Sequence, residues 1–412
     1  MYFVTEDMNF YQGHNPRELA ETYGSPLYVY NEQIFRARCQ DMMKLCTYPN
    51  FKVNYAIKAN TNITLLRIAR EEGLFVDASS PGETVAANAA GYTSEEIMLI
   101  INNVSADEFK FAIDRKLTVS VDSLSQLETF GRVNPGGKIC LRFNPGVGGG
   151  HHKKVITCGD GTKFGIMPEY IPQVKQLLAK YDLKLVGINH HIGSQNWGDI
   201  YLEGGEALLK IAHQFDDLEF IDLGGGFATP YNKQNGEKPL DLAKLGQGLD
   251  KYMHDFAQKY GKQLTFIIEP GRYVTAECAV LLGTVHALKN NGEVRYAGTD
   301  IGFSVLARTT LYDAHHDIEI YRASGEPLGN DTETINIVGN QCESGDYIAK
   351  ERTLPKLHEG DILGVLDAGA YGFSMSSTYN HRPRPAEVLI QADGAVKVIR
   401  TRESFEDMLR GM

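Results

Sequence analysis

Alternating apolar and polar positions recur along the first two thirds of the chain and predict β-strands. In the run Phe51–Ala59, apolar Val53, Tyr55 and Ile57 alternate with a second set of positions that ends at Lys58. Further strand-like runs, not all of which alternate, are Leu74–Ser80, Ile97–Asn102, Thr118–Asp122, Lys138–Asn144, Lys184–Ile192, Leu218–Leu223 and Leu264–Glu269. The pattern therefore predicts eight strands, with Lys58 near the carboxyl end of the first.

Most of these strands are separated by a stretch with the apolar spacing of an amphipathic helix, for example Ile63–Glu72 and Ile171–Lys180. An earlier strand over Pro26–Tyr30 and a helix over Gln33–Leu45 are also predicted. Strands that alternate with helices are typical of a (β/α)8 barrel of the TIM type. A doubly wound open sheet is the alternative, but eight units within about 240 residues favour the closed barrel.

Beyond Ala279 the runs become short and β-rich, and glycine, proline and asparagine separate them. These runs are Val280–Leu288, Asp317–Arg322, Thr334–Val338, Asp361–Val365, Ala386–Ile390 and Ala395–Arg400. They predict a second, all-β, barrel-like domain. The predicted domains are thus a (β/α)8 barrel over residues 30–279 and a β-rich domain over residues 1–29 and 280–412.

The composition is that of an ordinary soluble globular protein, since 42% of the 412 residues are hydrophobic and 23% are charged. A formal net charge of −11 argues against a nucleic-acid or anionic-membrane partner, because such surfaces need clustered lysine and arginine. No apolar run approaches the roughly 18–20 residues of a membrane span, and the first residues carry acids rather than a basic leader. We therefore expect a cytoplasmic protein.

The cysteines and histidines do not predict a metal site or a disulfide framework. The 6 cysteines show no C-x-x-C spacing, and Cys140 and Cys278 lie in apolar surroundings. Cys342 differs because it lies in a polar, glycine-bounded turn. His151 and His152 are adjacent but lack a nearby carboxylate partner. The preferred interpretation is that they are ordinary polar residues of a loop, and no metal is predicted.

Polar residues follow the predicted barrel strands at their carboxyl ends, where barrel enzymes place their active sites. A lysine in this position is either a solvated charge or an amine kept partly desolvated for Schiff-base chemistry. The residues that follow successive strands are Lys58, Asp77 with Glu83, His191 to Ser194, Gly224, Gly225 and Gly226, and Glu269 with Arg272.

Pyridoxal phosphate explains this combination of groups, because it needs an amine for its aldehyde, a phosphate cradle, a flat group against its ring and a partner for its pyridine nitrogen. The glycines let backbone N–H groups approach an anion, and Ser194 and Arg272 are phosphate-type donors. Glu269 suits the pyridine nitrogen, and His191 suits the ring face. The alternatives are a barrel-end salt bridge for Glu269 and a satisfied core histidine for His191 or His190.

The motifs YAIKAN, HIGSQ, DLGGG, EPGR, CESGD, DAGAYG and NHRPRPAEVL occur in this order between about residue 25 and residue 405. This ordered set resembles the fold-type III pyridoxal-phosphate decarboxylases, and most closely the branch that acts on meso-2,6-diaminopimelate. The resemblance implies that the protein converts meso-2,6-diaminopimelate to L-lysine and CO2, the last step of lysine biosynthesis. It also implies a homodimer with shared active sites, in which the partner chain supplies the segment Cys342–Glu343.

The resemblance carries individual roles onto matching residues. Lys58 would bind the cofactor's aldehyde, with Asp77 and Glu83 in support, and Cys342 would give a proton to the product. The cofactor-binding set would be Lys58, Asp77, His191, Ser194, Gly224, Gly225, Gly226, Glu269, Arg272 and Tyr371. The substrate-binding set would be Arg272, Arg308, Tyr312, Glu343 and Tyr371, with Arg308 and Tyr312 at the distal carboxylate and Glu343 at the distal ammonium.

Some features depart from the family pattern. The segment Pro145–Gly165 is rich in glycine and histidine, and the run Asp300–Phe303 replaces a more usual sequence. A related substrate, such as carboxynorspermidine, ornithine or lysine, therefore stays open, as does a surface or interface role for Arg308. Glu269 speaks against an alanine racemase, and Lys58 together with Cys342 speaks against a non-catalytic cofactor-binding relative.

Overall fold

The computed structural model describes residues 1–149, 157–159 and 161–412. His151, His152 and much of the segment Pro145–Gly165 lie outside the described residues. The chain forms two compact units. The barrel unit comprises Arg38–Ala228 and Leu240–Val274, and the β-rich unit comprises Met1–Ala37, Thr229–Pro239 and Thr275–Met412. The domain boundaries proposed from the sequence, at residues 29/30 and 279/280, stay a prediction.

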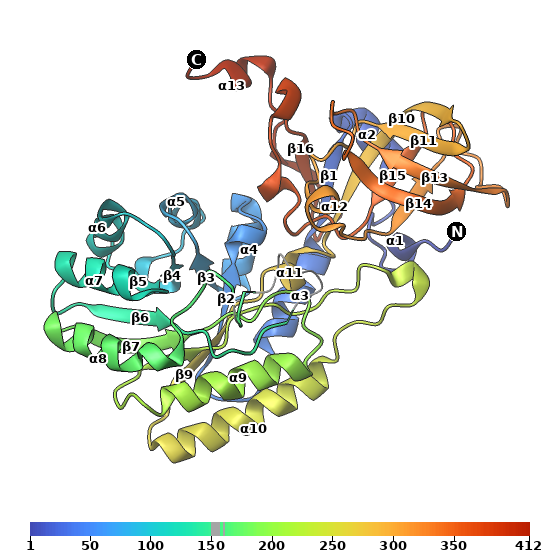
Figure 1. The fold of residues 1–412 in the computed structure, drawn as a ribbon. Helices are drawn as coiled ribbons and strands as arrows, with labels where there is room; N and C mark the ends of the chain where they lie inside the picture. The colour runs from blue at the N-terminus through green and yellow to red at the C-terminus, as the bar shows by residue number, and fades with distance from the viewer. Residues whose placement is uncertain (150–156, 160) are drawn as a thin grey trace. The chain divides into compact units, whose positions relative to one another are not determined.

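Eight parallel strands close the barrel, which confirms the predicted fold (Figure 1). Each strand pairs with the next along the chain, and the first strand also pairs with the last through Phe51 opposite Phe266 and Val53 opposite Ile268. The strands are β2 (Phe51–Ala56), β3 (Phe75–Ala78), β4 (Ile97–Ile100), β5 (Thr118–Val121), β6 (Lys138–Arg142), β7 (Lys184–Asn189), β8 (Phe220–Asp222) and β9 (Thr265–Ile268).

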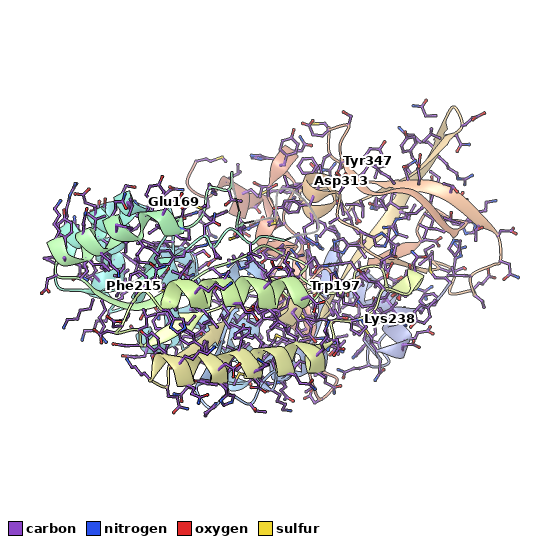
Figure 2. All side chains as sticks on the ribbon, turned by 60° about the horizontal axis from the view of Figure 1, so that its bottom comes forward. Glu169, Trp197, Phe215, Lys238, Asp313 and Tyr347 are labelled. Atoms are coloured by element: carbon purple, nitrogen blue, oxygen red, sulfur yellow. The ribbon has the colours of Figure 1, made fainter. Side chains whose placement is uncertain are left out.

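Side-chain caps start several of the helices that connect these strands. Asn62, Ser80, Ser105 and Ser123 each accept a hydrogen bond from a backbone N–H of the following first turn. These residues precede α4 (Ile63–Glu71), α5 (Pro81–Ala89), α6 (Ala106–Asp114) and α7 (Leu124–Val133). The later helices of the barrel unit are α8 (Ile171–Lys180), α9 (Asp199–Ala212) and α10 (Leu242–Tyr260). Figure 2 shows α9 and α10 side by side.

The predicted strands extend too far at their carboxyl ends. Strand β2 stops at Ala56, and Ile57–Ala59 forms a single 3-10 turn that the N–H of Asn60 closes by donating to the carbonyl of Ile57. Strand β7 stops at Asn189 rather than Ile192. Apolar alternation continues past both points, but the backbone leaves the sheet there. Lys58 therefore lies in the turn that follows β2 and not in the strand itself.

A nine-stranded sheet dominates the β-rich unit, in the order β14-β13-β11-β10-β1-β16-β17 with β15 paired to β10 and β12. Its strands are β1 (Leu27–Asn31), β10 (Ala279–Asn291), β11 (Val294–Thr299), β12 (Ile318–Tyr321), β13 (Thr332–Val338), β14 (Tyr347–Pro355), β15 (Ile362–Val365), β16 (Ala386–Ile390) and β17 (Val396–Arg400). Leu27, Val29, Leu282 and Val388 contribute to its buried apolar core. Strands β11 and β14 were not predicted.

Helices also occur in this unit, so it is mostly β rather than all-β. They are α1 (Val4–Asp7), α2 (Pro16–Tyr23), α12 (Arg308–Tyr312) and α13 (Phe405–Leu409). Two helices cross the division between the units, namely α3 (Glu32–Met43) and α11 (Arg272–Thr275). Among the helices that the structure describes, none is long and apolar enough to cross a membrane.

Candidate active site

Lys58 forms an ion pair with Asp77 at the carboxyl end of the barrel strands. The Lys58 Nζ atom lies 2.8 Å from Asp77 Oδ2, and the Asp77 side chain is buried. Glu83, in the first turn of α5, lies near both groups. Burial raises the pKa of Glu83, while its hydrogen bond from the Ser79 N–H acts in the opposite direction. The lysine ammonium is therefore held against a buried carboxylate in an acidic environment.

His191 follows β7 and is neutral in this environment. Its Nδ1 atom accepts a hydrogen bond from the N–H of Gly225 at 3.1 Å, so that nitrogen carries no proton. Burial lowers the pKa of His191 well below its usual value, and the positive charges of Lys58 and Arg142 lower it further. A neutral imidazole whose edge is fixed by a backbone N–H offers its flat face to a ligand.

The three glycines after β8 allow the loops at neighbouring strand ends to approach one another closely. A Cβ atom at Gly225 would lie 2.0 Å from the carbonyl oxygen of Glu269, and one at Gly226 would lie 2.1 Å from that of Gly193. Gly226 also has a φ of +105°, which side chains rarely tolerate. Any larger residue would push these loops apart. The glycines therefore make a compact backbone cradle at the ends of β7, β8 and β9.

Glu269 and Asp222 form a buried acidic pair. Burial raises the pKa of Glu269 well above its ordinary value, and the nearby carboxylates of Asp222 and Asp77 raise it further. Burial likewise raises the pKa of Asp222 to about 7. Glu269 Oε1 and Asp222 Oδ2 are buried without a hydrogen-bond partner among the described residues. A buried polar atom without a hydrogen bond lowers the stability of the fold, and a bound ligand that donates a hydrogen bond removes this loss.

Ser194 and Arg272 also belong to the barrel unit. Ser194 lies in the loop after β7 and is half-buried, whereas Arg272 begins α11 and is buried. The structure thus brings Lys58, Asp77 and Glu83 together. It also connects His191 with Gly225 by a hydrogen bond, and the N–H of Glu269 donates to the carbonyl of Gly224 in the glycine cradle.

Sequence reasoning missed Arg142, Asp122 and Asp222 as candidate residues. Arg142 ends β6, Asp122 follows β5 and Asp222 ends β8, so the strand-end rule applied to every strand would have found them. Desolvation lowers the pKa of Arg142, and burial raises that of Asp122. For His190, a satisfied core histidine was the alternative interpretation. Its ring is buried, and burial lowers its pKa to about 3, while a backbone hydrogen bond at Leu223 acts in the opposite direction.

These observations fit pyridoxal phosphate. The Lys58 amine suits the aldehyde, and the neutral face of His191 suits the ring. The N–H groups of Gly224 and Gly225 already donate to Asp222 and His191. Gly226, Ser194 and Arg272 are therefore the groups suited to the phosphate. The buried Glu269 Oε1 atom, which has no hydrogen-bond partner in the described chain, suits a donor such as a protonated pyridine nitrogen. The site thus supplies each type of group that the cofactor requires.

Arg308 lies in the β-rich unit, at the start of α12, and its side chain is 2% exposed. Its Nη1 atom lies 2.8 Å from His316 Nε2, and its guanidinium carbon lies 4.4 Å from the ring centre of Tyr231. Tyr312 ends the same short helix and is half-buried. This burial argues against the alternative that Arg308 is a surface charge.

Cys342 and Glu343 are exposed and share a small polar cluster with Tyr379 and Asn380. Asn380 accepts a hydrogen bond from the Cys342 N–H at 3.0 Å, and its amide donates to the Cys342 sulfur at 3.0 Å. The Tyr379 hydroxyl donates to Glu343, and this hydrogen bond raises the pKa of Tyr379 to about 12. Tyr371 is half-buried with a φ of +56°. Tyr379 was not predicted, whereas Asn380 lies in the NHRPRPAEVL motif.

The pyridoxal-binding domain of the pyridoxal-dependent decarboxylases matches residues 32–276. This match covers more than half of the chain, and the chain therefore belongs to the pyridoxal-dependent decarboxylase family. The predicted cofactor, pyridoxal phosphate, is confirmed by the same match.

Comparison along the whole chain narrows the assignment. The diaminopimelate decarboxylase of Methanothermobacter thermautotrophicus is 41% identical over 404 residues, which cover 96% of this chain and 93% of the relative. A crystal structure of a diaminopimelate decarboxylase has a TM-score of 0.88 and 33% identity, and covers 95% of this chain and 94% of that one. The Helicobacter pylori diaminopimelate decarboxylase complexed with L-lysine has a TM-score of 0.86 and 29% identity, with 96% and 98% covered. Within its family, the chain groups with the diaminopimelate decarboxylases of fold type III, which confirms the resemblance found in the sequence.

Proposed function

We propose that this protein releases CO2 from meso-2,6-diaminopimelate and leaves L-lysine, the last step of lysine biosynthesis, with pyridoxal phosphate bound at Lys58. The full-length similarity to diaminopimelate decarboxylases supports the reaction. The observation that carries the proposal is the buried Glu269 carboxyl, whose Oε1 atom has no hydrogen-bond partner among the described residues. It belongs to the same strand-end layer as the ion pair of Lys58 and Asp77.

The chain's own residues prepare the site for this reaction. Pyridoxal phosphate, when bound, supplies an electron sink for the negative charge that loss of CO2 leaves on the α carbon. A protonated pyridine nitrogen would offset the burial that raises the pKa of Glu269, and the ionised carboxylate would in turn hold that proton on the nitrogen, since opposite charges stabilise each other. Asp77 holds the Lys58 amine at the strand ends. The neutral imidazole of His191 covers the ring without adding a competing positive charge.

Substrate choice rests on residues of the β-rich unit. The Arg308 guanidinium suits the distal carboxylate, because its planar fork binds a carboxylate through two parallel hydrogen bonds. Glu343 takes the distal ammonium, and Tyr312, Arg272 and Tyr371 complete the substrate set. Ornithine and lysine, when they bind as substrates, place their only carboxylate at the reacting carbon. Nothing then pairs with Arg308 at the distal position, whereas lysine bound as the product keeps its carboxylate there. The missing pairing costs roughly 1–3 kcal/mol and favours the dicarboxylic substrate.

Cys342 is the proposed source of the proton that the α carbon gains after CO2 leaves. Its side chain is exposed in the single chain, and Asn380 orients its sulfur. We propose a homodimer in which Cys342 and Glu343 complete the site of the partner chain, and we expect the enzyme in the cytoplasm. Sedimentation of the purified enzyme tests the assembly, and a monomer with full turnover would contradict it.

The reaction is tested by CO2 release from meso-2,6-diaminopimelate, ornithine, lysine and carboxynorspermidine by the purified, cofactor-loaded enzyme. We expect release from meso-2,6-diaminopimelate, with lysine as the product. Arg308→Ala should lower kcat/KM for this substrate about a hundredfold, because a buried charge-assisted contact is lost. Arg295→Ala is the matched control, since Arg295 in the same unit pairs with Glu333 and has no proposed substrate contact. Release from one of the other three compounds alone would refute the substrate assignment.

A further inference from the structure

His316 is a buried residue that the proposed reaction does not yet use. It lies two residues before the start of β12, and the residue is 1% exposed. The Nδ1 atom lies 2.7 Å from the carbonyl oxygen of Leu366, and the Nε2 atom lies 2.8 Å from Arg308 Nη1. A carbonyl only accepts and a guanidinium only donates, so Nδ1 carries the proton and Nε2 offers a lone pair. Both partners therefore select the same neutral tautomer.

His316 and Tyr231 together fix the orientation of the Arg308 side chain. His316 accepts from one edge of the guanidinium, and the Tyr231 ring lies 4.4 Å from the guanidinium carbon. The His316 and Tyr231 rings meet edge to face, with centres 5.1 Å apart and planes at 77°. An edge contact and a face contact determine the plane of a guanidinium group. Binding a carboxylate through two parallel hydrogen bonds depends on that plane.

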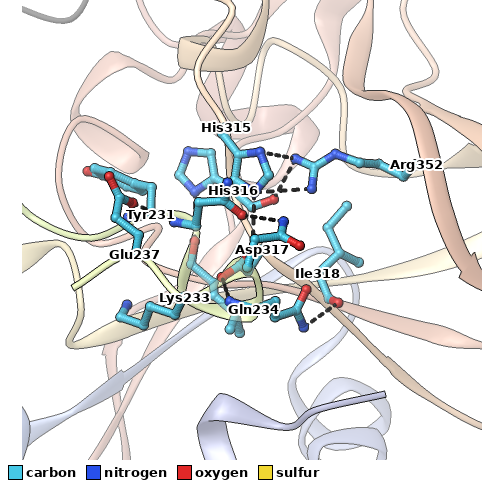
Figure 3. A network of polar contacts seen from close by, with 12 residues as sticks. Tyr231, Lys233, Gln234, Glu237, His315, His316, Asp317, Ile318 and Arg352 are labelled. Atoms are coloured by element: carbon cyan, nitrogen blue, oxygen red, sulfur yellow. Dashed lines mark hydrogen bonds and ion pairs between the residues drawn. The ribbon is translucent and has the colours of Figure 1, made fainter.

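The groups that hold Arg308 are themselves held by a polar network (Figure 3). Arg352 donates to the carbonyl of His316 at 2.9 Å, and Glu237 accepts from the Tyr231 N–H at 2.8 Å. Figure 3 shows His315, His316 and Asp317 facing the segment that carries Tyr231 and Gln234. The buried Asp317 accepts from the N–H of Gln234 at 2.9 Å, which ties this segment to the residues before β12.

We infer that His316 is a positioning residue that sets the preference for substrates with a distal carboxylate, by holding the Arg308 guanidinium plane. The inference rests on the proposed function, in which Arg308 binds that carboxylate. A neutral acceptor is well suited to this task. It restrains the guanidinium through a hydrogen bond but leaves its positive charge for the substrate, whereas an aspartate or glutamate in the same place would neutralise that charge.

A pair of polar substitutions isolates the contact. In His316→Asn, the short side chain keeps a donor for the Leu366 carbonyl but does not reach Arg308. In His316→Gln, the longer side chain returns an amide oxygen close to the position of Nε2. We expect His316→Asn to raise KM for meso-2,6-diaminopimelate roughly ten- to hundredfold with a much smaller change in kcat, and His316→Gln to restore most of the loss.

Ligand binding distinguishes positioning from a general structural role. L-Lysine retains the carboxylate that is distal to the reacting carbon, whereas cadaverine has the same chain and neither carboxylate. Calorimetry on the cofactor-loaded enzyme should show lysine binding weakened by His316→Asn by the same factor as KM. Cadaverine binding should change less than about threefold, because it makes no contact that depends on Arg308.

Several outcomes would overturn the inference. An unchanged KM in His316→Asn, an equal loss of lysine and cadaverine binding, or no recovery in His316→Gln each contradicts it. If His316→Asn does not fold, His316→Phe replaces it, since phenylalanine fills the same space without ring nitrogens. The wild-type assay separates the two proposals. Absence of CO2 release from meso-2,6-diaminopimelate by wild type refutes the reaction, whereas His316 is judged by the ratio of variant to wild-type lysine binding.

Discussion

Two lysine–carboxylate pairs of the same length lie at opposite ends of the barrel, on different strands. The pair of Lys58 and Asp77 at the carboxyl ends and the pair of Lys138 and Glu219 at the amino ends each have a separation of 2.8 Å between Nζ and carboxylate oxygen. Their surroundings differ. The carboxylate of Asp77 is 1% exposed, whereas that of Glu219 is 51% exposed and its lysine is 63% exposed.

This difference teaches that the length of an ion pair does not identify a functional lysine. Water screens the pair at the amino ends, so its removal has little consequence. The carboxyl groups of Glu83, Asp222 and Glu269 lie near Asp77. Desolvation is the main cause of the raised pKa of each of these three groups. Groups with perturbed pKa values that converge on one place are typical of active sites.

The sharpest test of the comparison is substitution of the two lysines. Lys58→Ala should lower the rate of CO2 release by several orders of magnitude, because the amine that binds the cofactor's aldehyde is lost. Lys138→Ala should leave turnover within about twofold of wild type, since its ion pair is solvent-exposed. Borohydride reduction followed by mass spectrometry adds a second measurement. It should attach the cofactor to wild type and Lys138→Ala but not to Lys58→Ala, and attachment at another lysine would refute the role of Lys58.

The acidic pair offers a smaller effect that is measured without the cofactor. The pKa of Asp222 is raised from 3.8 to about 7 in the fold. The folded state therefore binds more protons than the unfolded state between these values, and the Asp222 contribution to the unfolding free energy falls as pH rises toward 7. The slope for one such group is about 1.4 kcal/mol per pH unit.

Asp222→Asn should remove the Asp222 contribution to the dependence of the unfolding free energy on pH. His190 contributes a dependence of opposite sign, which then remains visible in the variant. Burial lowers the pKa of His190 from 6.5 to about 3, so its contribution to stability is present above pH 6.5 and is lost as pH falls toward 3. The two contributions have opposite signs between about pH 4 and 6.5. Urea unfolding of the cofactor-free enzyme across this range should show a steeper rise of stability with pH in Asp222→Asn than in wild type. Parallel curves would contradict the raised pKa of Asp222.

The sequence was sufficient to predict the barrel, and it nominated candidate site residues at the carboxyl ends of the barrel strands. Short strand-like runs located all eight barrel strands, because most of the residues in these strands are buried and apolar. Lys58, His191 and Glu269 could be selected because they follow such runs. Strands β11 and β14 were missed, since their sequences, VRYAGT and YIAKERTLP, mix charged, small and apolar residues without a clear period.

Contacts between residues distant in sequence could not be predicted in the same way. The hydrogen bond between His316 and the Leu366 carbonyl spans 50 positions, and that between Cys342 and the Asn380 side chain spans 38. The tautomer of His316 and the orientation of Cys342 depend on these contacts. Asp222 lies beside Glu269 because β8 pairs with β9, with Asp222 opposite Ile267, and the burial of both carboxyl groups depends on how the strand ends pack.

The smallest expected effect concerns the pair at the amino ends of the strands and completes the comparison. A double-mutant cycle with Lys138→Ala, Glu219→Ala and the double variant should give a coupling free energy of about 0.2–1 kcal/mol in urea unfolding, with unchanged kcat/KM. High salt should reduce this coupling, because both side chains are exposed and the charges are screened. A coupling of several kcal/mol that persists at high salt would mean that this end of the barrel excludes water as the carboxyl end does. Burial would then no longer distinguish the two pairs, and the assignment of Lys58 would rest on its sequence motif alone.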